Sequence, residues 1–324
     1  MAYDVQTWIN LAAYVGGGLA MGLGAVGAAI GEGYTAAQAN EALGQNPEMS
    51  GDVFKSMLVG QAIAESASIF ALVIAILLLF VNPSAPSAIT ASSLFGAGLC
   101  MGLGAIGSGV GSGIPGGQAC LGIVRQPAAA GKLTTNMLIG SAVCQTPAIF
   151  AMVVALVLIF IDYSNAPLFP TWAALIGAGL SMGLSAIGSG MGGGFAAGAS
   201  CEGIARQPES AANVTTTMLV GQAVSQTPAI FGLLISFVLM FKSHEASTTL
   251  SASMALLGAG ICMGFGGIGP GIGNGMAAEG AVRWVARNMS HAGELMRIML
   301  VGQAVSQSTA IYAMVISLVL IFVL

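Results

Sequence analysis

Long apolar stretches alternate with short polar segments along the whole chain. Four of the stretches are rich in glycine, and each is followed by a second apolar stretch. Every one exceeds the roughly 20 residues that a helix needs to cross the hydrocarbon core of a bilayer. We expect the glycine-rich helices over residues 8–44, 91–124, 171–205 and 251–287. The helices that follow them are expected over residues 50–80, 131–161, 210–242 and 292–323. The pattern predicts an all-α membrane protein with eight transmembrane helices.

The eight helices form a fourfold repeat of one antiparallel hairpin. A short string ending in Gly-Gln-Ala or Gly-Ser-Ala returns in steps of 80, 81 and 81 residues, at residues 59–62, 139–142, 220–223 and 301–304. The connection inside each unit is short and polar, whereas the units are joined by turn-rich links at residues 82–86, 162–170 and 242–249. We therefore divide the chain into hairpins at residues 1–82, 83–163, 164–244 and 245–324.

The charged residues support a lipid environment and indicate an orientation. Only 6% of the residues are charged, against about 25% in a soluble domain. A basic stripe that would bind nucleic acid is missing from the sequence. Seven of the eight Lys and Arg residues lie in or near the loops within the hairpins, and only Lys242 lies at the other side. The positive-inside rule therefore predicts cytoplasmic hairpin loops, with both termini on the opposite side of the membrane.

The first helix of each hairpin carries a ladder of glycines. The ladders begin at Gly22, Gly102, Gly183 and Gly264, and several contain the spacing Gly-x-Gly-x-x-Gly. A dinucleotide-binding fingerprint follows a strand and opens a helix, whereas these glycines lie inside apolar helices. We therefore expect no organic cofactor. Small residues allow helix backbones to approach closely in a membrane, as on the inside of a ring.

Two carboxylates lie at membrane depth, where an ionisable group indicates function. Glu32 precedes Gln45, at the loop, by 13 residues or roughly 20 Å of helix. Glu65 follows Ser50 by 15 residues or roughly 22 Å. The two carboxylates should therefore reach the same level in an antiparallel hairpin. In a low dielectric they cannot both remain charged without a cation, so either one keeps a proton or the pair shares a metal ion.

The other three hairpins keep the polar shape of this position without its charge. Glutamines replace Glu65 at Gln145, Gln226 and Gln307. Glu32 is replaced by Ser112, Gly193 and Asn274. A hydroxyl follows the carboxylate position in every hairpin, at Ser66, Thr146, Thr227 and Ser308. Each chain therefore has one chargeable site among four similar polar positions.

Two prolines and several further acids allow more than one interpretation. Pro147 and Pro228 follow the hydroxyl in the middle hairpins, and each frees the carbonyl four residues earlier. The freed carbonyls of Val143 and Val224 fit either ligands for a hard cation or a simple kink. The acids Glu202 and Glu279, toward the cytoplasmic ends of their helices, are expected to be solvated.

Together these features resemble the membrane rotor protein of rotary ATPases, which is the c subunit of F-type ATP synthases and the proteolipid of V-type pumps. The resemblance rests on the glycine ladder, on the loop Arg125-Gln126-Pro127 with its counterparts, and on the motif from Gly60 to Ser66. It implies a non-catalytic subunit in a ring of hairpins that carries Na⁺ or H⁺ past a stator a subunit with an essential arginine. It also implies that central-stalk subunits dock on the hairpin loops, through Arg125, Arg206 and Arg287. Gln45 departs from this pattern in the first loop.

The resemblance also implies a ligand set for a Na⁺ ion. It consists of Glu32 and Glu65 with a hydroxyl of the Ser66 type and a backbone carbonyl of the Ile63 type. The hydroxyl and carbonyl would come from a neighbouring hairpin. They are those of Thr146 and Val143 if the second hairpin is the neighbour, or those of Ser308 and Val305 if it is the fourth hairpin of another copy.

The full polar set favours Na⁺ over H⁺ as the transported ion. The resemblance leaves open whether one-hairpin c subunits join the ring. The alternative function is a non-rotary membrane pore or structural ring, although a plain pore gains nothing from two buried acids at equal depth.

Overall fold

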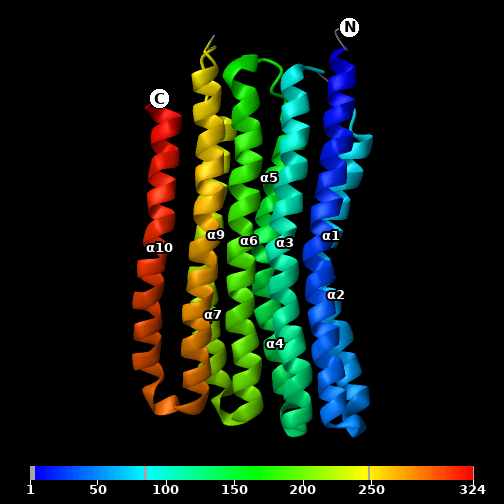
Figure 1. Ribbon diagram of the computed structural model, residues 1–324, viewed down its shortest axis with the longest axis vertical. Coiled ribbons are helices and arrows are strands. Elements are labelled where there is room, and N and C mark those ends of the chain that lie inside the picture. Colours follow the sequence, from blue (N-terminus) through cyan, green and yellow to red (C-terminus); the bar gives the residue numbers. More distant parts are fainter. Residues whose placement is uncertain (1–3, 84–85, 247–248, 324) are drawn as a thin grey trace.

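The computed structural model describes residues 4–83, 86–246 and 249–323, and four helical hairpins lie side by side within them (Figure 1). The expected links between hairpins fall partly outside these ranges, at residues 84–85 and 247–248. The glycine-rich helices are α1 (Val5–Gln45), α3 (Ala88–Arg125), α6 (Leu168–Arg206) and α9 (Leu250–Arg287). They begin up to three residues earlier than the sequence predicted and end within one residue of the predicted positions.

The second helices differ between the outer and the middle hairpins. In the first and last hairpins, α2 (Ser50–Phe80) and α10 (Ala292–Phe322) are continuous. In the middle hairpins the helix is divided into α4 (Ala130–Cys144) and α5 (Thr146–Phe160), and into α7 (Ala211–Ser225) and α8 (Thr227–Phe241). The single helices expected over residues 131–161 and 210–242 are therefore interrupted. Pro147 and Pro228 explain the interruption, because proline removes a helical hydrogen bond and its ring displaces the preceding turn.

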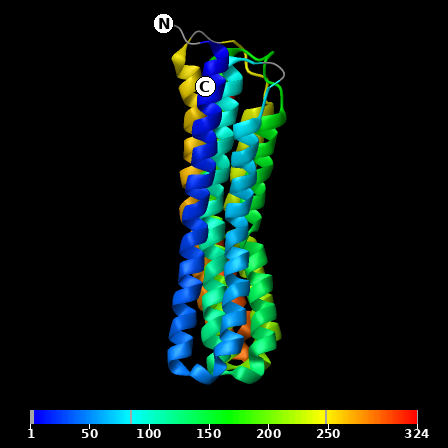
Figure 2. The same cartoon turned by 90° about the vertical axis from the view of Figure 1, so that its right-hand side faces the viewer.

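The helices form two layers (Figures 1 and 2). One layer contains α1, α3, α6 and α9, which pack against one another in that order, and the second helices pack behind them. The short 3₁₀ turns of the hairpins lie at one end of the molecule, at η1 (Pro47–Met49), η2 (Pro127–Ala129), η3 (Pro208–Ser210) and η4 (Met289–His291). Both ends of the chain lie at the opposite end (Figure 1). Among the described residues, eight helical segments are long and apolar enough to cross a membrane.

Glycines allow the helices of the first layer to approach closely. A Cβ atom added at Gly113, Gly194 or Gly275 would lie within 3.0 Å of the backbone of the preceding glycine-rich helix. The same repeat position in α1 is Gly33, where an added Cβ would have no described neighbour within 4 Å. On the other edge, a Cβ added at Gly269 would have no described neighbour within 4 Å, whereas one added at its counterpart Gly188 would lie within 3.0 Å of the backbone of α9. The two edges of the molecule therefore present the two halves of an interface that occurs three times inside the chain.

Candidate ion-binding site

One hydrogen bond fixes the depth of Glu32 against α2. The amide Nε2 of Gln61 donates to the backbone carbonyl of Glu32 at 3.3 Å, one turn before Glu65. Glu32 on α1 and Glu65 on α2 consequently lie at a similar depth in the hairpin. The equal depth expected from the helix rise therefore agrees with their placement.

The same bond recurs in all four hairpins and gives the repeated string a structural role. In the other hairpins the donors are Ser141, Gln222 and Gln303, and the acceptors are the carbonyls of Ser112, Gly193 and Asn274, at 3.1, 3.0 and 2.9 Å. The repeat revealed the motif, but only the packing shows that its polar residue joins the two helices of each hairpin.

The glutamines that replace Glu65 are buried and take part in polar contacts with their own inner helix. Gln145 Nε2 donates to Ser112 Oγ at 2.6 Å, and Asn274 Nδ2 donates to Gln307 Oε1 at 2.7 Å. In the third hairpin Gly193 offers no side chain, and Gln226 Nε2 makes a long bond of 3.4 Å to the carbonyl of Ser189. The exposed fractions of Gln145, Gln226 and Gln307 are 6%, 6% and 9%.

The preceding hairpin completes two of these polar positions. Gln145 Nε2 also donates to the carbonyl of Ile63 at 2.8 Å. In the last hairpin, Asn274 Nδ2 donates at 3.4 Å to the carbonyl of Val224, which occupies the Ile63 position of the third hairpin. The carbonyl of Ile63 is thus directed to the site of the second hairpin.

Glu65 lies in the first hairpin of the described residues, without a preceding hairpin among them, and it is exposed. At the opposite edge, Val305 takes the place of Ile63 in the last hairpin and is 70% exposed. Ser308, half-buried beside it, donates through Oγ to the carbonyl of Val305 at 2.7 Å. Ser66 donates in a comparable way to the carbonyl of Ala62, at 3.2 Å. The two edges of the chain therefore carry separate parts of one polar arrangement.

Inner-helix serines satisfy the backbone where the prolines interrupt the second helices. The N–H of Ala148 donates to Ser108 Oγ at 3.1 Å, and the N–H of Ala229 donates to Ser189 Oγ at 3.2 Å. These bonds act as caps at the start of α5 and α8, where N–H groups lack helical partners. They support the interpretation of Pro147 and Pro228 as tolerated kinks in these two hairpins.

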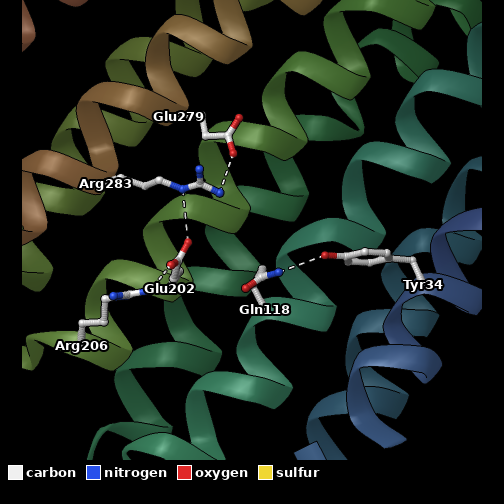
Figure 3. Close-up of polar contacts among 6 residues, drawn as sticks. All are labelled: Tyr34, Gln118, Glu202, Arg206, Glu279 and Arg283. Carbon is white, nitrogen blue, oxygen red and sulfur yellow. Dashed lines mark hydrogen bonds and ion pairs between the residues drawn. The ribbon is translucent and has the colours of Figure 1, made fainter. Parts of the chain in front are cut away.

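A second polar group lies near the hairpin-turn end of the glycine-rich layer (Figure 3). Arg283 contacts Glu202 at 3.2 Å and Glu279 at 2.8 Å, and Arg206 contacts Glu202 at 2.6 Å. The side chains of Glu202 and Glu279 are only 18% and 25% exposed. The expectation that both acids are solvated was therefore wrong, because Arg283 contacts both of them. Glu279 lies one turn before Arg283 on α9, whereas Glu202 lies on the adjacent helix α6, a neighbour that hydropathy and charge along the sequence do not reveal.

The three arginines of the loop motif lie at the ends of the glycine-rich helices. Arg125, Arg206 and Arg287 are the last residues of α3, α6 and α9. All three are exposed, and the guanidinium of Arg287 lies 4.8 Å from the centre of the Trp284 ring. They are thus accessible at the end of the molecule that holds the hairpin turns.

The sequence profile of a family described as the C subunit of ATP synthase matches four segments, one in each hairpin, at residues 15–78, 95–158, 176–239 and 257–320. The chain belongs to this family. The resemblance noted in the sequence and the all-α membrane fold are thereby confirmed, with four copies of the family's hairpin in one chain.

Relatives named as K and c subunits of ATP synthases share this repeat to different extents. The chain is similar to the K subunit of the A-type ATP synthase of Methanocaldococcus jannaschii, with 34% identity over 60% of this chain and 80% of the relative. It is also similar to the ATP synthase c subunit of Natranaerobius thermophilus, with 46% identity over 25% of this chain and 92% of the relative. A third similarity, to the chloroplastic ATP synthase c subunit of Ostreococcus tauri, has 50% identity over 23% of this chain and 92% of the relative. One hairpin here thus corresponds to nearly the whole length of these two shorter relatives.

Proposed function

We propose that this member of the ATP synthase C family forms the rotor ring of a rotary ATPase and carries one ion per chain on Glu65. The main support is the asymmetry among four similar positions. Three hold neutral glutamines buried against a neighbouring hairpin, and the fourth holds the exposed Glu65 at an edge, with the half-buried Glu32 beside it. A second copy would cover that edge, as each hairpin covers the next inside the chain.

The hydrogen-bond pattern favours the last hairpin of another copy as the second half of the site. Inside the chain, the carbonyl at the Ile63 position serves the following hairpin. By the same pattern, Val305 and Ser308 of one copy supply a carbonyl and a hydroxyl to Glu32 and Glu65 of the next. Val143 and Thr146 would instead face the neutral position at Gln226.

Na⁺ is the ion that this set of ligands fits best. Two carboxylates, a carbonyl and a hydroxyl give a hard cation several oxygen ligands, and the ion would neutralise the repulsion between Glu32 and Glu65. A proton needs fewer acceptors, so H⁺ is the alternative cargo at the same carboxylate. The buried glutamines mimic the loaded state, since the amide of Gln145 already donates to the Ile63 carbonyl where an ion would bind.

The remaining parts of the machine follow from the family. The ring would move past a stator a subunit with an essential arginine, and central-stalk subunits would dock on the turn end through Arg125, Arg206 and Arg287. Placing these turns in the cytoplasm agrees with the positive-inside rule. One-hairpin c subunits remain optional members of the ring, and ATP hydrolysis or synthesis would be coupled to its rotation.

Carbodiimide labelling tests the carboxylate. A hydrophobic carbodiimide reacts with protonated carboxyls in lipid, so it should modify Glu65 before any other acid. Bound Na⁺ would keep the site unprotonated, so added NaCl should slow the labelling, most clearly at raised pH. Mass spectrometry of membranes labelled with and without NaCl measures both effects.

The variant Glu65→Gln provides the control, because it should remove the rapidly labelled residue. KCl at the same concentration controls for ionic strength. Labelling of Glu65 that ignores Na⁺ at every pH would remove Na⁺ and leave H⁺ as the cargo. Rapid labelling elsewhere, with Glu65 unreactive, would contradict the whole site assignment.

Ring closure can be tested at Gly33. The substitution Gly33→Leu should leave a single chain folded, because nothing lies within 4 Å of its added Cβ, but it should prevent a second copy from packing there. The intact ring should therefore be lost from membranes solubilised in mild detergent, while single chains persist. Gly280→Leu is the matched control, since Gly280 is equally open and its repeat counterparts include Gln38 and Gln118. Normal rings in Gly33→Leu would contradict packing across this edge.

A further inference from the structure

The net charge of the ionisable residues near the turn end has opposite signs in the first and last hairpins. The group in Figure 3, with the nearby Arg287, contains three arginines and two glutamates, which leaves an excess of one positive charge. In the described part of the chain, Arg287 has no ion pair and only the contact with Trp284. The excess positive charge therefore lies on α9, the last helix of the glycine-rich layer.

The first hairpin carries the opposite excess. Its turn end contains the acids Glu41, Glu48 and Asp52 and the base Lys55, a balance of minus two. Lys55 lies 3.8 Å from Asp52, whereas Glu41 accepts only a long 3.5 Å bond from Gln45. Glu41 is exposed near the end of α1 and has no ion pair with any described residue.

The fourfold repeat places these residues at equivalent positions. Glu41 corresponds to Leu121, Glu202 and Arg283, in steps of 80, 81 and 81 residues. Gln45 corresponds to Arg125, Arg206 and Arg287 in the same steps. At these two positions α1 therefore has an acid and an amide, α6 has an acid and a base, and α9 has two bases. There, α6 balances its own charge, through the contact between Arg206 and Glu202.

The contact between α6 and α9 shows which interaction the Glu41 repeat position makes between neighbouring helices. Arg283 on α9 reaches back to Glu202 on α6, a residue at the same repeat position. If α1 of a second copy follows α9 as α9 follows α6, Glu41 of that copy takes the place of Arg283 and reaches back to α9. There it meets Arg283 and Arg287. A guanidinium has five N–H donors and can serve more than one carboxylate.

We propose that Glu41 of one copy binds Arg283 and Arg287 of the preceding copy, and that this contact joins two copies of the chain directly. We call the contact of α9 and α10 with α1 and α2 of another copy the seam. The glycine edges support the same head-to-tail arrangement, because Gly33 and Gly269 leave open the surfaces that their counterparts cover inside the chain. Contacts of this kind generate a closed ring when the rotation between copies closes.

The contact distinguishes the seam from the three interfaces inside the chain. This inference rests on the proposed ring, but the contact involves residues outside the ion site. It also requires that the neighbour at the seam be a second copy of this chain. A one-hairpin protein inserted at the seam would separate Glu41 from α9.

Charge reversal tests the contact in rings isolated from membranes. Glu41→Arg should lower the temperature at which the ring dissociates into single chains on a detergent gel. Arg287→Glu should do the same, and the double variant should regain most of the loss, because it restores opposite charges. Glu48→Arg is the matched control, since it makes the same charge change in the exposed turn of the same hairpin. Should Glu41→Arg assemble too poorly to purify, Glu41→Gln gives the smaller shift.

Cross-linking identifies the neighbour. In Arg287→Lys the new amine can be joined to Glu41 by a water-soluble carbodiimide, which links an amine and a carboxylate only when they touch. The expected product contains two or more full chains, and it should vanish when Glu41→Gln is added. A product joining the chain to a smaller protein would overturn the direct contact.

The outcomes separate this inference from the proposed function. If the wild-type chain never forms a ring, the ring proposal and the seam fail together. If it forms a ring whose stability is the same for Glu41→Arg and Glu48→Arg, or if the double variant regains nothing, only the seam contact is overturned. Neither result depends on whether Glu65 carries Na⁺ or H⁺.

Discussion

Replacing Glu65 with glutamine should abolish ion transport by the ring while leaving the ring assembled. Glutamine already occupies this position in three hairpins and is buried there without harm to packing. The variant would therefore have four neutral positions, and none of its hairpins could load or release an ion at the stator. ATP-driven ion uptake into liposomes should fall to background, and the detergent gel should still show the ring.

The matched control is Gln226→Leu, which should keep substantial transport. Among the described residues, the side chain of Gln226 makes only the long bond to Ser189, and its Oε1 is buried without a hydrogen-bond partner. Leucine is close to it in size, so the loss to packing should be small. Gln145 is a poorer control because it donates to both Ser112 and Ile63.

Two results would contradict this interpretation. Transport that survives in Glu65→Gln would show that another group carries the ion. A Gln226→Leu ring that assembles but cannot transport would show that the glutamines take part in ion passage.

The sequence predicted the helices well because their signal is local. An apolar stretch longer than a bilayer crossing predicts a transmembrane helix without any knowledge of its neighbours, and the repeat shows which helices pair as hairpins. The equal depth of Glu32 and Glu65 followed from the rise per residue, because a straight helix converts residue counts into distance. At Pro147 and Pro228 the sequence left open a cation ligand or a kink, and the expected ranges crossed both prolines as single helices.

Contacts between hairpins could not be derived in the same way. The direction in which Ile63 points, toward the site of the following hairpin, depends on the hand in which hairpins pack. The sequence accordingly left two neighbours open for Glu65. Likewise, Glu202 looked like a solvated acid because its partner Arg283 is 81 residues away. A repeat comparison could have suggested this pair, since the two residues share one repeat position.

The number of ions carried per ATP should be about one quarter of that of an equally large ring with a carboxylate in every hairpin. If the proposed function holds, one Glu65 among four hairpins would give one ion per chain in each turn. An elementary charge crossing 100 mV releases about 2.3 kcal/mol. At ~150 mV a chain would therefore contribute about 3.5 kcal/mol per turn, against about 14 kcal/mol if all four hairpins carried an ion.

Such a rotor is suited to pumping against a steep gradient and poorly suited to synthesis. The energy of each ATP would be spread over few ions, so each ion could be driven further uphill. In the reverse direction, few ions per turn would supply too little free energy at ordinary membrane potentials. Addition of one-hairpin proteins that each bear a carboxylate would raise the ratio and relax this limit.

The measurement is the number of ions transported per ATP in liposomes, alongside the protein composition of the isolated ring. Gln307→Glu is an informative variant because its position already has Asn274 beside it and the Val224 carbonyl of the preceding hairpin within reach of that amide. If this carboxylate loads and unloads, the ratio should approach twice the wild-type value. A wild-type ring made of this chain alone that reached three or four ions per chain in each turn would contradict the single site at Glu65, because only a carrier in every hairpin could supply them.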